Sequence, residues 1–128
     1  MRPFEEALTA ELAGLLRASV PARAVRITVR ERLVTRFERG PLGAREVQDA
    51  VEAAVRAACR LARELDAGDE VVEVVCWAAL EAVRGHGGES ARWLPDATRA
   101  VATLLEELAP ERVREPAWGW LAARLSRW

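Results

Sequence analysis

Apolar residues recur along most of the chain at intervals of three and four, the spacing that places side chains on one face of an α-helix. The first run predicts a helix that begins near Pro3 and ends before Ser19, Val20 and Pro21, because the residue before a proline disfavours helical backbone. The apolar stripe of this helix consists of Phe4, Leu8, Leu12, Leu15 and Leu16.

A second segment, residues 21–39, ends at a Gly-Pro pair that should stop a helix firmly. Its apolar positions include Val25, Ile27 and Val29, which alternate with polar residues. Alternation is typical of a strand, so a short extended stretch over residues 25–29 stays open as an alternative. Such a stretch would turn the intervening arginines toward solvent.

The clearest pattern predicts a helical hairpin over residues 44–84. Apolar positions hold a 3.6-residue rhythm over residues 44–66, and a short Ala-Gly connection follows. The next segment, residues 69–84, is apolar almost all round, which predicts a helix at the centre of a bundle. The β-branched residues at 71–75 allow a strand there, but the length of the segment favours a helix.

A fifth helix is expected after the glycine-rich residues 85–88, with Pro95 in its first turn and a short turn from Ser90 before it. Pro110 and Pro116 then divide the remainder into a short turn and a last helix over about 116–128. The pattern therefore predicts a single all-α domain over residues 1–128. Its architecture should be an antiparallel bundle of about five or six helices around the central hairpin.

Composition supports closely packed helices. The chain has 128 residues and a mass of 14.1 kDa, and 51% of its residues are hydrophobic, among them 25 alanines. Charged residues make up 30% and the formal net charge is −1, which excludes a disordered tail and a strongly basic nucleic-acid protein. All 19 basic residues are arginines, and Asn and Tyr are absent as well. This bias is typical of a GC-rich bacterial genome, so the arginines need not reflect function.

Three glutamates, Glu5, Glu6 and Glu11, argue against a secretory leader in the first twenty residues. No uncharged run approaches the roughly 20 residues of a membrane span. We therefore expect a cytoplasmic protein, with Cys59 and Cys76 as reduced thiols. Because both cysteines are equidistant from the hairpin turn, they should lie at one level on adjacent helices.

Candidate catalytic chemistry is sparse. The only histidine, His86, lies between glycines, and no Ser or Cys nucleophile is suitably spaced from it. No short Cys or His spacing suggests a metal site. The sequence predicts a non-catalytic protein without a cofactor or a metal.

Residues 17–39 carry seven arginines and two glutamates, a local charge of +5. On a helical wheel, Arg32, Arg36 and Arg39 share a polar face, where they could contact phosphates. This basic surface supports an alternative function, a nucleic-acid-binding accessory protein, although no aromatic interleaving accompanies it.

Three further arginines, Arg23, Arg26 and Arg30, fall on the apolar side of the same segment. They could line a pocket for an anionic ligand, but pairing with a carboxylate is favoured because an unpaired buried charge is costly. Asp69, Glu70 and Glu73, at the start of the fourth helix, are the expected partners. At least one ion pair between the two segments is predicted.

Three of the five tryptophans lie in the last eleven residues. On a helix, Trp118, Leu121, Leu125 and Trp128 share one face, and Trp120 points the other way. The segment is expected to dock on the bundle, to bind a partner or a second copy, or, least favoured, to lie at a membrane surface. The favoured function is a small interaction protein that forms a homo-oligomer or binds another protein through these residues.

Overall fold

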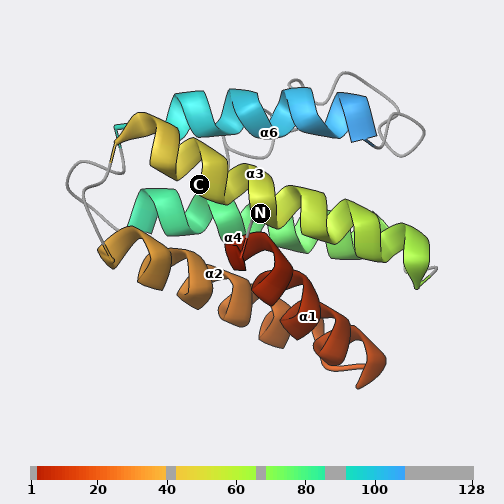
Figure 1. The fold of residues 1–128 in the computed structure, drawn as a ribbon. Coiled ribbons are helices and arrows are strands. Elements are labelled where there is room, and N and C mark those ends of the chain that lie inside the picture. Colours follow the sequence, from red (N-terminus) through yellow and green to blue (C-terminus); the bar gives the residue numbers. More distant parts are fainter. Residues whose placement is uncertain (1–2, 40–42, 66–68, 86–91, 109–128) are drawn as a thin grey trace.

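The computed structural model describes residues 3–39, 43–65, 69–85 and 92–108, and within these ranges all regular structure is helical (Figure 1). The all-α prediction is therefore confirmed. The helices are α1 (Pro3–Arg17), α2 (Ala22–Glu38), α3 (Ala44–Glu64), α4 (Asp69–Gly85) and α6 (Leu94–Leu108). Their bounds lie within a few residues of those expected from the apolar pattern.

Both stretches that could have been extended are helical. Residues 25–29 lie inside α2 and residues 71–75 lie inside α4. Val25 and Val29 are buried, four residues apart on one face of α2. Burial on one face of a helix outweighs the small helix-propensity penalty of β-branched residues, so their alternation did not indicate a strand.

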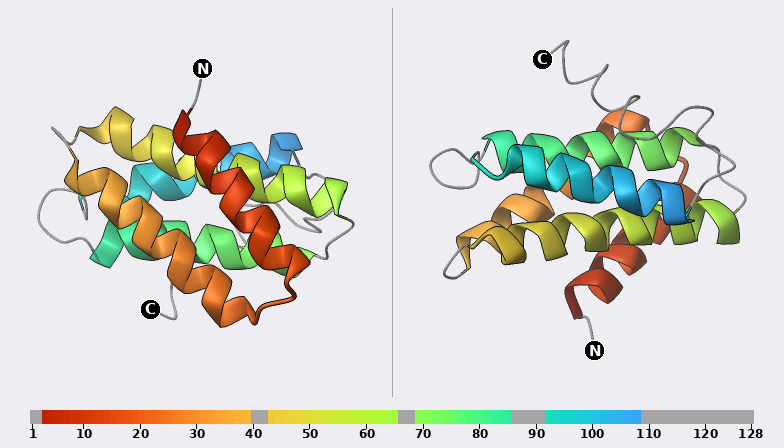
Figure 2. Two further views of the ribbon diagram at one scale, coloured as in Figure 1. Left: turned by 60° about the horizontal axis from the view of Figure 1, so that its bottom comes forward. Right: turned by 90° about the horizontal axis from the view of Figure 1, so that it is seen from above.

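The helices form three layers, with α3 and α4 in the middle (Figures 1 and 2). Helix α6 covers one side of this pair, and α1 and α2 cover the other. Helix α1 packs mainly on α3, whereas α2 packs mainly on α4. The hairpin predicted over residues 44–84 is thus the centre of the fold, and α3 is as central as α4.

Alanine dominates the buried face of α3. Six of its eleven buried residues are alanines, and buried alanines recur in α4. Small side chains let helix axes approach closely, so a slender bundle can bury a continuous core. No helix that the structure describes is long and apolar enough to cross a membrane.

Two free thiols lie at the contact of the central helices. Cys59 on α3 and Cys76 on α4 are both buried. Burial raises the pKa of Cys76 well above its usual range, and the neighbouring Cys59 raises it further. The influence of Cys59 on Cys76 fits the expectation that the two residues face each other across the hairpin.

A tight turn joins α1 to α2. The amide of Val20 donates to the Leu15 carbonyl over 3.3 Å, and that of Ser19 donates to Leu16 over 3.1 Å. Ser19 has a φ of 54°, the left-handed conformation that ends a helix in this hydrogen-bonding pattern. The turn therefore holds the end of α1 beside the start of α2.

The contact of α2 with the central layer predicts a sharp contrast between two substitutions on that helix. Leu33 is fully buried, so Leu33→Ala should lower the free energy of unfolding by about 2–5 kcal/mol. Ile27 is 38% exposed, and Ile27→Ala should change it by less than about 0.5 kcal/mol. Urea denaturation measures both, and equal effects would contradict this placement of α2.

Burial of the thiols predicts slow alkylation. The thiolate is the reactive form, and the raised pKa of Cys76 keeps its thiol protonated at pH 7–9, where an exposed cysteine ionises. Iodoacetamide should therefore modify neither cysteine of the folded chain appreciably, even at pH 9, but both in 6 M guanidinium. Mass spectrometry counts the adducts, and rapid labelling of the folded chain would show that the α3–α4 contact opens.

Candidate functional site

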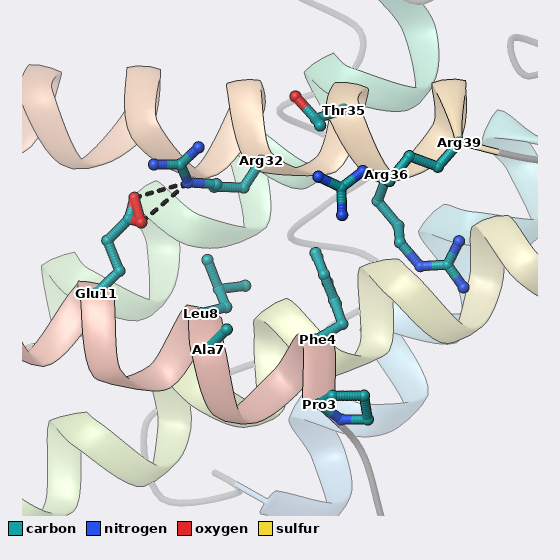
Figure 3. A pocket seen from close by; sticks show the side chains of 9 residues that line it. All are labelled: Pro3, Phe4, Ala7, Leu8, Glu11, Arg32, Thr35, Arg36 and Arg39. Carbon is teal, nitrogen blue, oxygen red and sulfur yellow. Dashed lines mark hydrogen bonds and ion pairs between the residues drawn. The ribbon is translucent and has the colours of Figure 1, made fainter.

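A groove with a volume of about 510 Å³ lies between α1 and α2 (Figure 3). One wall belongs to each helix, and the two walls differ in chemistry. From α1 come mostly apolar side chains, and from α2 come three arginines and a threonine. The lining residues are Pro3, Phe4, Ala7, Leu8, Glu11, Arg32, Thr35, Arg36 and Arg39.

The groove arises because α1 and α2 rest on different helices of the central layer. Helix α1 lies along α3 and helix α2 lies along α4. For this reason α1 and α2 meet near residues 17–22 and diverge from there (Figure 2). The result is a V whose closed end lies at the turn. Its open end lies between the first turn of α1 and the last turn of α2.

The apolar part of the groove comes from the first two turns of α1. Phe4 is half-buried, Leu8 is buried and Ala7 is exposed, and Phe4 and Leu8 extend toward α2 (Figure 3). Leu8 also belongs to the core of the bundle. The apolar surface of the groove is therefore continuous with the core and rests on a rigid support.

One arginine of the opposite wall has a partner in the groove. The Nε atom of Arg32 donates to both carboxylate oxygens of Glu11, at 2.9 Å each. The hydrogen bond and the charge of Glu11 raise the pKa of Arg32. The Arg32 side chain is exposed and that of Glu11 is partly exposed, so the pair fixes the arginine in position more than it stabilises the fold.

The other two arginines, Arg36 and Arg39, form no ion pair with any residue that the structure describes. They are three positions apart on α2 and therefore share one face of the helix. One of their guanidinium groups lies above Phe4, and the other extends away from it, toward α3 in this view (Figure 3). The first turn of α1 carries Glu5 and Glu6, so the positive charge at this end of the groove comes from the arginines of α2. The open end of the groove thus favours negative charge.

Arg26 and Arg30 face the opposite side of α2, toward α4. Arg26 forms an ion pair with Glu81, and Nη1 of Arg30 lies 3.8 Å from Oε2 of the same carboxylate. Glu81 is 16% exposed, and the two arginine side chains are about half exposed. An ion pair between the two segments is therefore present, as expected.

The partner in this pair differs from those expected. The ion pairs of Arg26 and Arg30 that the structure describes go to Glu81, which lies near the end of α4. Glu81 lies twelve positions after Asp69, about 18 Å farther along the helix. No ion pair of Arg26 or Arg30 with Glu70 or Glu73 is present among the described residues, and the side chain of Asp69 lies outside them.

The structure also changes the interpretation of the predicted basic surface. Arg32, Arg36 and Arg39 do share one side of α2, but this side faces α1 and lines the groove. The contribution of α1 was missed, because Phe4 and Leu8 were interpreted only as core residues. Glu11, a single carboxylate among apolar neighbours, was the one available signal that α1 faces a basic element.

Some predicted features fall outside the described residues. Trp118, Trp120, Leu121, Leu125 and Trp128 all do, as does the loop residue His86. Within the described ranges, no three Cys, His, Asp or Glu side chains are grouped so as to hold a metal ion. Among the described residues, the α1–α2 groove combines apolar surface with two arginines, Arg36 and Arg39, that form no ion pair.

No protein-family model, curated protein or solved structure matches this chain.

The Glu81 pair predicts a measurable contribution to stability. Glu81→Gln removes a mostly buried charge that serves two arginines, so the free energy of unfolding should fall by about 1 kcal/mol. Glu31→Gln, an exposed change on α2, should have little effect. In 0.5 M NaCl the difference between the variants should shrink. Equal stabilities at low salt would mean that Glu81 does not hold α2 on α4.

Proposed function

We propose that this chain is a non-catalytic protein that acts through protein–protein contacts in the cytoplasm, and that the α1–α2 groove is its contact surface. The observation that carries the proposal is the pairing of an apolar wall with Arg36 and Arg39, which lack partners among the described residues. Protein interfaces are rich in such combinations, with apolar side chains at the centre and arginines beside them.

The chemistry of the groove suits binding. Its one carboxylate, Glu11, is occupied by Arg32 over two 2.9 Å contacts. The remaining polar groups are guanidinium groups and the hydroxyl of Thr35, which bind and orient other molecules. A partner that covers the groove would also remove the exposed Ala7 and the half-buried Phe4 from water.

Nucleic-acid binding is the alternative, and the arrangement of the arginines argues against it. Phosphate tracking requires a row of outward-facing cations. Here Arg32 is held by Glu11, Arg26 and Arg30 meet Glu81, and Arg36 and Arg39 stand beside apolar surface. Self-association through the tryptophan-rich residues 116–128 stays a prediction, because this segment lies outside the described residues.

A selection experiment tests the proposal. Random 16-residue peptides displayed on phage are selected on the full chain, and the enriched sequences are synthesised and titrated by fluorescence anisotropy. Ala7→Trp fills the groove from an exposed position and should weaken binding at least about tenfold, which is about 1.4 kcal/mol. Ala10→Trp is the matched control, because Ala10 is exposed on the same helix but does not line the groove.

Two outcomes would contradict the proposal. The first is that no peptide is enriched, or that both tryptophan variants weaken binding equally. The second is tight binding of a 20-nucleotide DNA probe with a steep loss of affinity between 50 and 200 mM salt. That salt dependence is the signature of phosphate contacts and would favour the alternative.

A further inference from the structure

We infer that the occupant of the groove is an acidic amphipathic helix of a partner protein. Its apolar residues would lie against Phe4, Ala7 and Leu8, and its carboxylates would pair with Arg36 and Arg39. This inference rests on the proposed function and names the chemistry of the partner. It follows from the length of the groove, the different chemistry of its two walls and the position of Arg36 and Arg39.

The length of the groove corresponds to two turns of a helix. Along α1 it extends from Pro3 to Glu11, and along α2 from Arg32 to Arg39. At 1.5 Å per residue these distances are about 12 Å and 10.5 Å. Apolar side chains at positions i, i+3, i+4 and i+7 of a bound helix cover the same distance.

The volume sets how deeply the occupant enters. About 510 Å³ accommodates several side chains, whereas a whole helix is too thick to sink between α1 and α2. A helix that lies along the V would insert one apolar face and keep its other face in water. Helix-in-groove recognition is a recurrent binding mode, and both walls here are themselves helices.

The distribution of charge requires acidic groups at one end of this helix. Near the closed end of the groove, Arg32 is neutralised by Glu11. At the open end, Arg36 and Arg39 form no ion pair with a described carboxylate. Two carboxylates one turn apart on the partner helix would face two guanidinium groups that are also one turn apart.

The same asymmetry sets the orientation of the partner. A helix whose apolar face lies on Phe4 and Leu8 can satisfy Arg36 and Arg39 only if its acidic turn lies at the open end. The Glu11–Arg32 pair closes the other end, so a shifted register would place carboxylates near Glu11 and repel them. The charges of the groove therefore determine where along it the partner helix binds, as well as how tightly.

A pair of synthetic peptides tests this inference. Both are 14-residue amphipathic helices with one apolar face, and they differ only at two edge positions one turn apart, which are Glu in one and Gln in the other. Fluorescence anisotropy measures their affinities for the full chain. The acidic peptide should bind about tenfold more tightly at low salt, and the preference should diminish in 0.5 M NaCl.

Charge-matched variants separate the groove from general attraction. The double variant Arg36→Gln, Arg39→Gln should abolish the preference for the acidic peptide. The control Arg17→Gln, Arg23→Gln removes the same charge from exposed positions outside the groove and should retain the preference. If both double variants reduce the preference equally, the inference is wrong, because the peptides then sense only the net charge of the chain.

The remaining outcomes distinguish this inference from the proposed function. If both peptides bind equally and Ala7→Trp blocks both, the groove binds a partner without a preference for acidic groups. In that case only the inference fails. If neither peptide binds although phage-selected peptides occupy the groove, the occupant is a different kind of segment. If nothing binds in either experiment, the proposed function fails as well.

Two measurements address the other possible occupants. Sedimentation reports whether the chain self-associates, and an association blocked by Ala7→Trp but not by Ala10→Trp would make a second copy the occupant. Deletion of residues 117–128 reports whether the chain fills its own groove. A gain in peptide affinity of about tenfold after that deletion would assign the groove to the tail and overturn the inference.

Discussion

The close contact between α3 and α4 is the constraint on which the rest of the structure depends. Alanines and valines line this contact, and the two cysteines are buried beside them. Because the small side chains bring the two helices together, the pair forms a layer with apolar surface on both sides. Every other described helix is placed by where it rests on this layer.

That placement explains how a small bundle acquires a groove without an insertion or a long loop. Helices α1 and α2 are neighbours in the chain and are joined by a tight turn at Ser19, yet each follows a different helix of the central layer. Their separation leaves the first turns of α1 opposite the last turns of α2. A groove therefore arises directly from the packing of the core.

Much of this fold could be predicted from the sequence, because helical periodicity reports which face of each segment is buried. The hairpin at 44–84 follows from that signal alone. Periodicity does not report the level at which two helices cross. For this reason the partner of Arg26 was expected at Asp69, Glu70 or Glu73 and is in fact Glu81, about three turns away from Asp69.

The groove was hidden from the sequence for the same reason. A helical wheel of one segment is enough to show that one face carries Arg32, Arg36 and Arg39. Whether this face meets Phe4 and Leu8 depends on how α1 and α2 each pack on the central layer, and no local sequence pattern encodes that packing. A basic stripe that suggested phosphate contacts thus becomes one wall of a groove whose other wall is apolar.

The most direct test of this account is a nuclear magnetic resonance titration of the isotope-labelled full chain with the acidic peptide. Backbone amides and arginine Nε–H groups report the contact surface residue by residue. The account predicts that the largest changes fall on residues 3–11 of α1 and 32–39 of α2, with the Nε–H signals of Arg36 and Arg39 among them. Changes concentrated on α6, or scattered over the exposed arginines of the whole chain, would contradict it.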